Sequence, residues 1–167
     1  MRLIPSDKLS TVRRRTPFTG RQPDGVLTRT NATAIDEIVT AQEEGIAVGI
    51  AGEKKAQELR ELAQAAEDLQ ERGWTKHPEL SVFNTWSDVR THAESEDGED
   101  LRPLVALVDR AGARQVGRAI DRCVPVQDAR TTVSTAHVAK GLEWPQVHIA
   151  DDFREPKPGE PMPAEEA

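Results

Sequence analysis

Residues 25–50 read GVLTRTNATAIDEIVTAQEEGIAVGI, and this stretch decides the fold class. It starts with a β-prone run over 25–30, after which Asn31 stands where a helix N-cap is expected. The middle part is amphipathic and helical, because apolar residues recur at helical spacing until Gly45 stops the pattern. Apolar and small residues then alternate over 46–50, which is typical of a strand buried on one face. The stretch therefore predicts strand, helix and strand, the smallest crossover unit of a parallel sheet.

Outward from this unit, the chain is mostly helical until strand patterns return. A long helix is predicted over 53–72, and shorter helices follow over 87–92, 101–110 and 113–123, the first of them capped by Ser87. Two further strands are predicted over 131–135 and 146–150, joined by a Gly-containing loop or short helix. We therefore expect an α/β fold: a partial parallel sheet with flanking helices from residues 25–52 and 125–153, and a small helical insertion over 53–124.

The two ends of the chain have biased compositions. Residues 1–24 form a basic leader, and residues 1–30 contain seven Lys or Arg against two Asp, although the whole chain has a net charge of −7. Such a basic start can mark an edge that faces phosphates, or it can be a solvated Arg-rich loop, and the charge pattern leaves both open. Residues 154–167 are rich in Pro and Glu, so they are predicted to form a disordered tail.

Composition also excludes several classes of protein. Cys123 is the only cysteine, which rules out an intramolecular disulfide framework and a Cys-rich metal site. A metal site of Cys123, His137 and His148 matches no standard ligand spacing, so we expect no metal. The longest apolar stretch, 46–51, is far shorter than the roughly 20 residues that cross a bilayer. We therefore expect no membrane partner and a cytoplasmic location.

Residues 133–153, VSTAHVAKGLEWPQVHIADDF, carry the candidate site. A strand brings Thr135 and His137 to its carboxyl end, where ligands usually bind in an open α/β sheet. Gly141 permits a tight turn or a close approach of the backbone to a ligand, and Glu143 follows it closely. The combination of hydroxyl, imidazole and carboxylate fits a phosphate backbone on one side and a ribose hydroxyl on the other.

Four other residues have less specific surroundings in the sequence. Asp151 and Asp152 are interpreted as solvated carboxylates at a strand terminus rather than as an acid–base pair, because nothing nearby marks a proton-transfer partner. Trp74 and Trp86 could stack on bases, but core packing or partner contact in the helical block is favoured for both.

The spacing Thr-x-His-x-x-Lys-Gly-Leu-Glu-aromatic, from Thr135 to Trp144, resembles motif V of the UvrD/PcrA/Rep-type superfamily 1 DNA helicases. Residues 147–153 are similar to the branch of that family that includes the F-box DNA helicases. Upstream, residues 26–32, VLTRTNA, resemble the strand-to-helix segment of the second RecA-like domain in the same family. The two matches stand in the family's order, on either side of a helical insertion.

The resemblance implies a partial RecA-like domain of an ATP-dependent helicase that moves 3′ to 5′ along DNA, so single-stranded DNA is the expected partner. It implies that Gly141 and Glu143 belong to the nucleotide-binding side and that Lys140 and Leu142 shape the motif loop. The residues that it implies as DNA-binding are Arg29, Asn31, Thr135 and His137.

The sequence contains no Gly-x-x-x-x-Gly-Lys-Ser/Thr phosphate-binding loop. In the helicase interpretation, the first RecA-like domain is missing, so ATP and Mg²⁺ are expected only together with such a domain. A separate P-loop helicase domain could supply it in trans. The chain alone is expected to have no catalytic residues and no ATPase activity, because phosphoryl transfer depends on positioned charges. A second class stays open, namely a standalone module that binds nucleic acid or a protein without motor activity.

Overall fold

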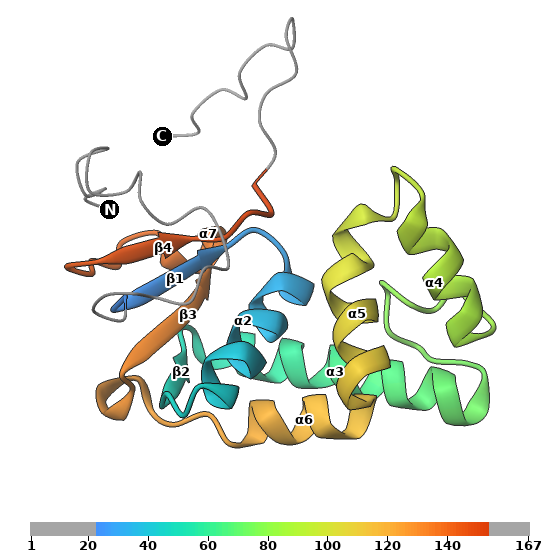
Figure 1. Ribbon diagram of the computed structural model, residues 1–167, viewed down its shortest axis with the longest axis horizontal. Helices are drawn as coiled ribbons and strands as arrows, with labels where there is room; N and C mark the ends of the chain where they lie inside the picture. The colour runs from blue at the N-terminus through green and yellow to red at the C-terminus, as the bar shows by residue number, and fades with distance from the viewer. Residues whose placement is uncertain (1–22, 154–167) are drawn as a thin grey trace, which may run out of the picture.

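The computed structural model describes residues 23–153, which form a mixed α/β architecture (Figure 1). Four strands make one sheet in the order β2-β3-β1-β4, and every neighbouring pair is parallel. The strands are β1 (Gly25–Thr28), β2 (Val48–Ile50), β3 (Thr131–Thr135) and β4 (Val147–Ile149). The predicted parallel α/β fold is therefore confirmed. The tail and nearly all of the basic leader lie outside the described residues.

The first two strands of the chain do not pair with each other, because β3 lies between them. Val26 of β1 stands opposite Val133 of β3 on one side and His148 of β4 on the other. The helix α2 (Asn31–Glu43) thus carries the chain past the position of β3 before β2 begins. The sheet is therefore complete only when strands from both halves of the described chain come together.

Helices lie beside the sheet, and α4 lies farthest from it (Figure 1). The other long elements are α3 (Glu53–Arg72), α4 (Trp86–Glu94), α5 (Arg102–Ala111) and α6 (Ala113–Asp121). Short elements complete the path: η1 (Glu99–Leu101), η2 (Val126–Asp128) and α7 (Ala136–Ala139). The bounds of α3 are those predicted, and it ends at Gly73, whose φ of 77° is the left-handed value that glycine adopts readily.

Two of the predicted helix N-caps are wrong. Thr30 caps α2, and its Oγ1 accepts the backbone N–H of Thr33 at 3.1 Å, so the prediction of Asn31 as N-cap is wrong. Thr85 caps α4 in the same way, so the prediction of Ser87 as the N-cap of that helix is wrong as well. Thr, Ser and Asn all cap helices well, so a run of such residues does not select the capping position from the sequence alone.

One apolar cluster joins the sheet to the helical insertion. It contains Val26 and Val133 from the strands, Ile38 from α2, Leu62 from α3 and Leu104 from α5. In addition, α2 contacts both α5 and α6. The insertion therefore shares its hydrophobic core with the sheet. Within residues 23–153, no helix has both the length and the apolar character needed to cross a membrane.

Candidate nucleic-acid interface

The carboxyl ends of the strands define the candidate site, because all four strands run in the same direction. Thr28 at the end of β1 pairs in register with Thr135 at the end of β3. Arg29 follows the first of these strands and His137 follows the second. The two segments that resemble helicase motifs therefore meet at one edge of the sheet.

Thr135 and His137 have different environments although they are close in sequence. Thr135 is buried, with 5% of its surface exposed, and its Oγ1 has no hydrogen-bond partner among the described residues. His137 lies in the short helix α7 and is exposed. Of these two predicted DNA-binding residues, only His137 is open to a ligand in this conformation.

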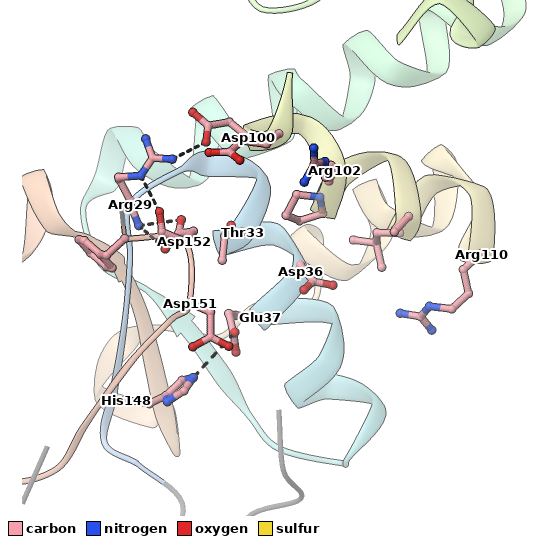
Figure 2. A pocket seen from close by; sticks show the side chains of 15 residues that line it. Arg29, Thr33, Asp36, Glu37, Asp100, Arg102, Arg110, His148, Asp151 and Asp152 are labelled. Carbon is pink, nitrogen blue, oxygen red and sulfur yellow. Dashed lines mark hydrogen bonds and ion pairs between the residues drawn. The ribbon is translucent and has the colours of Figure 1, made fainter. Parts of the chain in front are cut away.

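Arg29 is bound to two segments that are distant in the sequence (Figure 2). Its Nε donates to the carbonyl oxygen of Asp152 at 2.6 Å, and its Nη2 donates to the carboxylate of Asp100. Asp100 lies in η1, within the insertion, and Asp152 follows β4. The guanidinium of this predicted DNA-binding residue is therefore already engaged by acceptors of the same chain.

Asp152 is the central acceptor of this edge. Its carboxylate accepts the backbone N–H of Arg29 at 2.9 and 3.0 Å, the N–H of Thr30 at 2.8 Å and the Thr30 hydroxyl at 3.1 Å. The prediction of a merely solvated carboxylate is therefore wrong for Asp152. Asp151 beside it is exposed, as expected. No local pattern in the sequence marks Asp152, because its partners lie at the other end of the described chain.

Asn31 contacts the start of α3 rather than facing open solvent. Its Oδ1 accepts a hydrogen bond from the Nζ of Lys55 at 3.2 Å, and the same ammonium pairs with Glu58. Lys55 thus adds a cation beside a predicted DNA-binding residue. No pattern in the sequence marks Lys55, since it stands in a long charged helix where a solvated lysine is the ordinary case.

The loop after α7 is open to solvent. Lys140, Gly141, Leu142 and Glu143 are all exposed, and the backbone N–H of Leu142 donates to the carbonyl of Ala139 at 2.9 Å. Gly141 has a φ of 90°, in the left-handed region that favours glycine. Glu143 therefore follows a turn that depends on glycine, and its side chain is accessible to a ligand.

Close contacts with two glycines fix the segments on either side of this loop. A Cβ at Gly25 would lie 2.5 Å from the ring of Trp144, so β1 accepts the indole because that position has no side chain. A Cβ at Gly52 would lie 2.8 Å from the side chain of Val138. The aromatic residue of the motif-like stretch thus packs on β1, and α7 packs on the start of α3.

A groove of about 820 Å³ lies between α2, α5 and the residues after β4 (Figure 2). Its lining mixes carboxylates with arginines, among them Asp36, Glu37, Asp100, Asp151, Arg102 and Arg110. His148 is buried at the β4 side, with its Nε2 4.0 Å from the carboxylate of Glu37. This groove was not predictable from the sequence, because its walls come from three separate segments.

Trp86 and Trp74, the two candidates for base stacking, occupy different environments. Trp86 is buried, with 6% of its surface exposed, and its Nε1 donates to the carboxylate of Asp109 at 2.8 Å. The hydrogen bonds from Arg90 are the main cause that lowers the pKa of Asp109, and the bond from Trp86 adds to the effect. Trp74 is 53% exposed. Core packing is therefore confirmed for Trp86, whereas Trp74 lies at the surface.

Cys123 is half-buried, and burial raises the pKa of its thiol to about 11. The thiol is therefore protonated near neutral pH and is a poor nucleophile there. In the part of the chain that the structure describes, no three His, Cys, Asp or Glu side chains are arranged to hold a metal ion.

The similarity of the chain to known proteins is limited, since no protein-family model and no solved structure matches it. Among curated proteins, it is similar to F-box DNA helicase protein 1 of Schizosaccharomyces pombe, with 24% identity over 144 residues. The similarity covers 79% of this chain and 16% of that relative, so the chain spans only a small part of the relative's length. The similarity suggests a helicase-related family for this chain.

Proposed function

We propose that this chain is part of an ATP-dependent 3′–5′ DNA helicase of the UvrD-like type and contributes to its second RecA-like domain. In this role, the carboxyl edge of the sheet contacts single-stranded DNA, and the loop with Gly141 and Glu143 contacts the nucleotide. ATP with Mg²⁺ then binds between this domain and a P-loop domain that belongs to another chain or to another part of a longer protein.

The observation that carries the proposal is the register of β1 and β3. Because Thr28 pairs with Thr135, the residues after both strands leave the sheet at the same edge. A cation, Arg29, and an exposed imidazole, His137, therefore follow adjacent strand ends. Side chains of these types contact phosphate and sugar in nucleic-acid complexes. The similarity to part of a DNA helicase supports the same conclusion.

The nucleotide side of the proposal rests on the loop after α7. Gly141 holds a left-handed turn, and Glu143 extends from it into solvent. A carboxylate in such a position can accept hydrogen bonds from the two ribose hydroxyls. The base and phosphates of the nucleotide need further partners, which a P-loop domain on the other side of the nucleotide would provide.

Binding of a fluorescently labelled oligo(dT) to the full chain, followed by anisotropy at several salt concentrations, tests the DNA part. We expect weak binding that falls with salt, with a slope of log K against log salt of about −0.7 for each phosphate contacted. His137→Ala should weaken binding by about two- to fivefold, the effect of one modest hydrogen bond. His77→Ala is the matched control, because His77 lies in the loop beyond the far end of α3.

Two results would count against this DNA surface. Binding that does not respond to salt would mean that phosphates are not the groups recognised. Equal weakening by the His137 and His77 substitutions would mean that DNA lies elsewhere on the molecule.

A further inference from the structure

The guanidinium of Arg29, a cation at the proposed DNA edge, is already held by an acid of the same chain. Its Nη2 donates to the carboxylate of Asp100, while its Nε donates to the Asp152 carbonyl (Figure 2). The side chains of Arg29 and Asp100 are 32% and 40% exposed, so this ion pair lies where another anion can reach it. Ion pairs this exposed contribute little to stability, and exchange of one anion for another therefore costs little.

The position of Asp100 is fixed by packing on both sides of it. Leu101 is buried in the apolar cluster that joins the insertion to the sheet. A Cβ at Gly98 would lie 1.9 Å from the carbonyl oxygen of His92 in α4. The turn before η1 therefore packs closely against α4 because Gly98 has no side chain. The η1 turn also contacts α2. The carboxylate is therefore held beside Arg29 by the fold and does not reach it from a loose loop.

A phosphate that approaches Arg29 is attracted by the guanidinium and repelled by the Asp100 carboxylate. Arginine binds carboxylate and phosphate with the same donors, so the two anions compete for one set of N–H groups. A phosphate that shares the site with Asp100 is also repelled by that carboxylate at short range. The ion pair thus lowers the affinity of this edge for any phosphate.

We propose that Asp100 competes with nucleic-acid phosphate for Arg29, so that the helical insertion restrains the DNA affinity of the sheet edge. The inference rests on the proposed function, because it needs DNA to bind at this edge. It assigns to the insertion a contact that lowers the phosphate affinity of the site in the folded chain, since the Asp100 carboxylate occupies a donor of Arg29.

Asp100→Asn tests the proposal, since it removes the charge and keeps the size of the side chain. In the anisotropy assay with oligo(dT), we expect about two- to fivefold tighter binding at low salt. The salt slope should become steeper by about 0.7, the contribution of one added phosphate contact on a single strand. Asp121→Asn is the matched control, because it removes the same charge from an exposed pair in which Arg60 Nε lies 2.6 Å from the carboxylate.

A double-mutant cycle separates competition for Arg29 from a general change in charge. In an Arg29→Gln background, Asp100→Asn should tighten binding no more than Asp121→Asn does. A full gain in that background, or no gain beyond the control in the wild-type background, would overturn the inference while leaving the proposed function intact. If neither the wild-type chain nor any variant binds, the proposed function fails, and the inference fails with it. Thermal unfolding checks that each variant folds, and Asp100→Ser replaces Asp100→Asn if the latter does not.

Discussion

A single carboxylate, that of Asp152, organises the carboxyl edge of the sheet. It accepts the backbone N–H groups of Arg29 and Thr30, which come directly before α2. N–H groups at the start of a helix have no partner within the helix, and a negative charge there interacts favourably with the helix dipole. The same residue follows β4, so it ties the end of one strand to the turn after another. The Asp152 carboxylate therefore fixes the backbone of Arg29, whereas the guanidinium is held by the Asp152 carbonyl and the Asp100 carboxylate.

Asp152→Ala should lower the free energy of unfolding by about 1–3 kcal/mol, because backbone N–H groups of Arg29 and Thr30 lose their acceptor. Asp151→Ala is the matched control, since the neighbouring carboxylate is exposed, and its effect should stay within about 0.5 kcal/mol. Urea unfolding followed by circular dichroism measures both. Equal losses for the two variants would show that the hydrogen bonds of Asp152 contribute nothing to stability.

At the scale of helices and strands, the periodic spacing of apolar residues is sufficient to predict most elements. The apolar stripe of α3 recurs at helical spacing over the whole element, and Leu59, Leu62 and Leu69 are all buried as expected. The capping predictions failed for α2, where Asn31 is the better cap by propensity but Thr30, held by Asp152, occupies the capping position. Local sequence patterns therefore locate a helix or strand more accurately than they locate its first residue.

The candidate site could be predicted only in part, for a physical reason. The strand predictions place Arg29 and His137 after strands of a parallel sheet, but the sheet order that makes β1 and β3 neighbours was seen only in the structure. The contacts of Arg29 with Asp100 and Asp152 do not follow from the strand predictions either, because they join residues that are far apart in sequence. Such long-range polar contacts leave no periodic signal, since each partner alone resembles an ordinary solvated charge.

Substitution of Trp86, the first residue of α4, can be compared with substitution of Trp74, which lies before this helix. Trp86→Ala should lower the free energy of unfolding by about 3–5 kcal/mol, since it leaves a cavity beneath α4 and removes the hydrogen bond to Asp109. Trp74→Ala should change it by less than about 1 kcal/mol, because that ring is largely exposed. Denaturant unfolding of the two variants provides the comparison. A loss at Trp74 as large as that at Trp86 would contradict the surface position of Trp74, and a loss below about 1 kcal/mol at Trp86 would contradict its assignment to the core.

At the scale of the whole molecule, the core connects the insertion to the site. Leu104 of α5 and Val133 of β3 belong to one apolar cluster, and the η1 turn that bears Asp100 contacts α2. Displacement of the insertion would therefore change both the packing of the sheet and the ion pair of Arg29. Without the insertion, α2 would lose its contacts with α3, α5 and α6, so the two parts depend on each other for stability.

The 167-residue chain alone should hydrolyse no ATP above background, with or without single-stranded DNA, because its sequence contains no Gly-x-x-x-x-Gly-Lys-Ser/Thr loop to hold the phosphates. A coupled ATPase assay checks this, and turnover by the pure chain would contradict it. If a P-loop helicase domain is encoded beside this chain, the separately produced domain should give DNA-stimulated turnover when the two are mixed. Glu143→Ala should then raise the KM for ATP by about three- to tenfold, whereas Glu79→Ala, an exposed carboxylate in the insertion, should leave it unchanged. DNA binding without restored turnover would favour a standalone binding module over a divided motor.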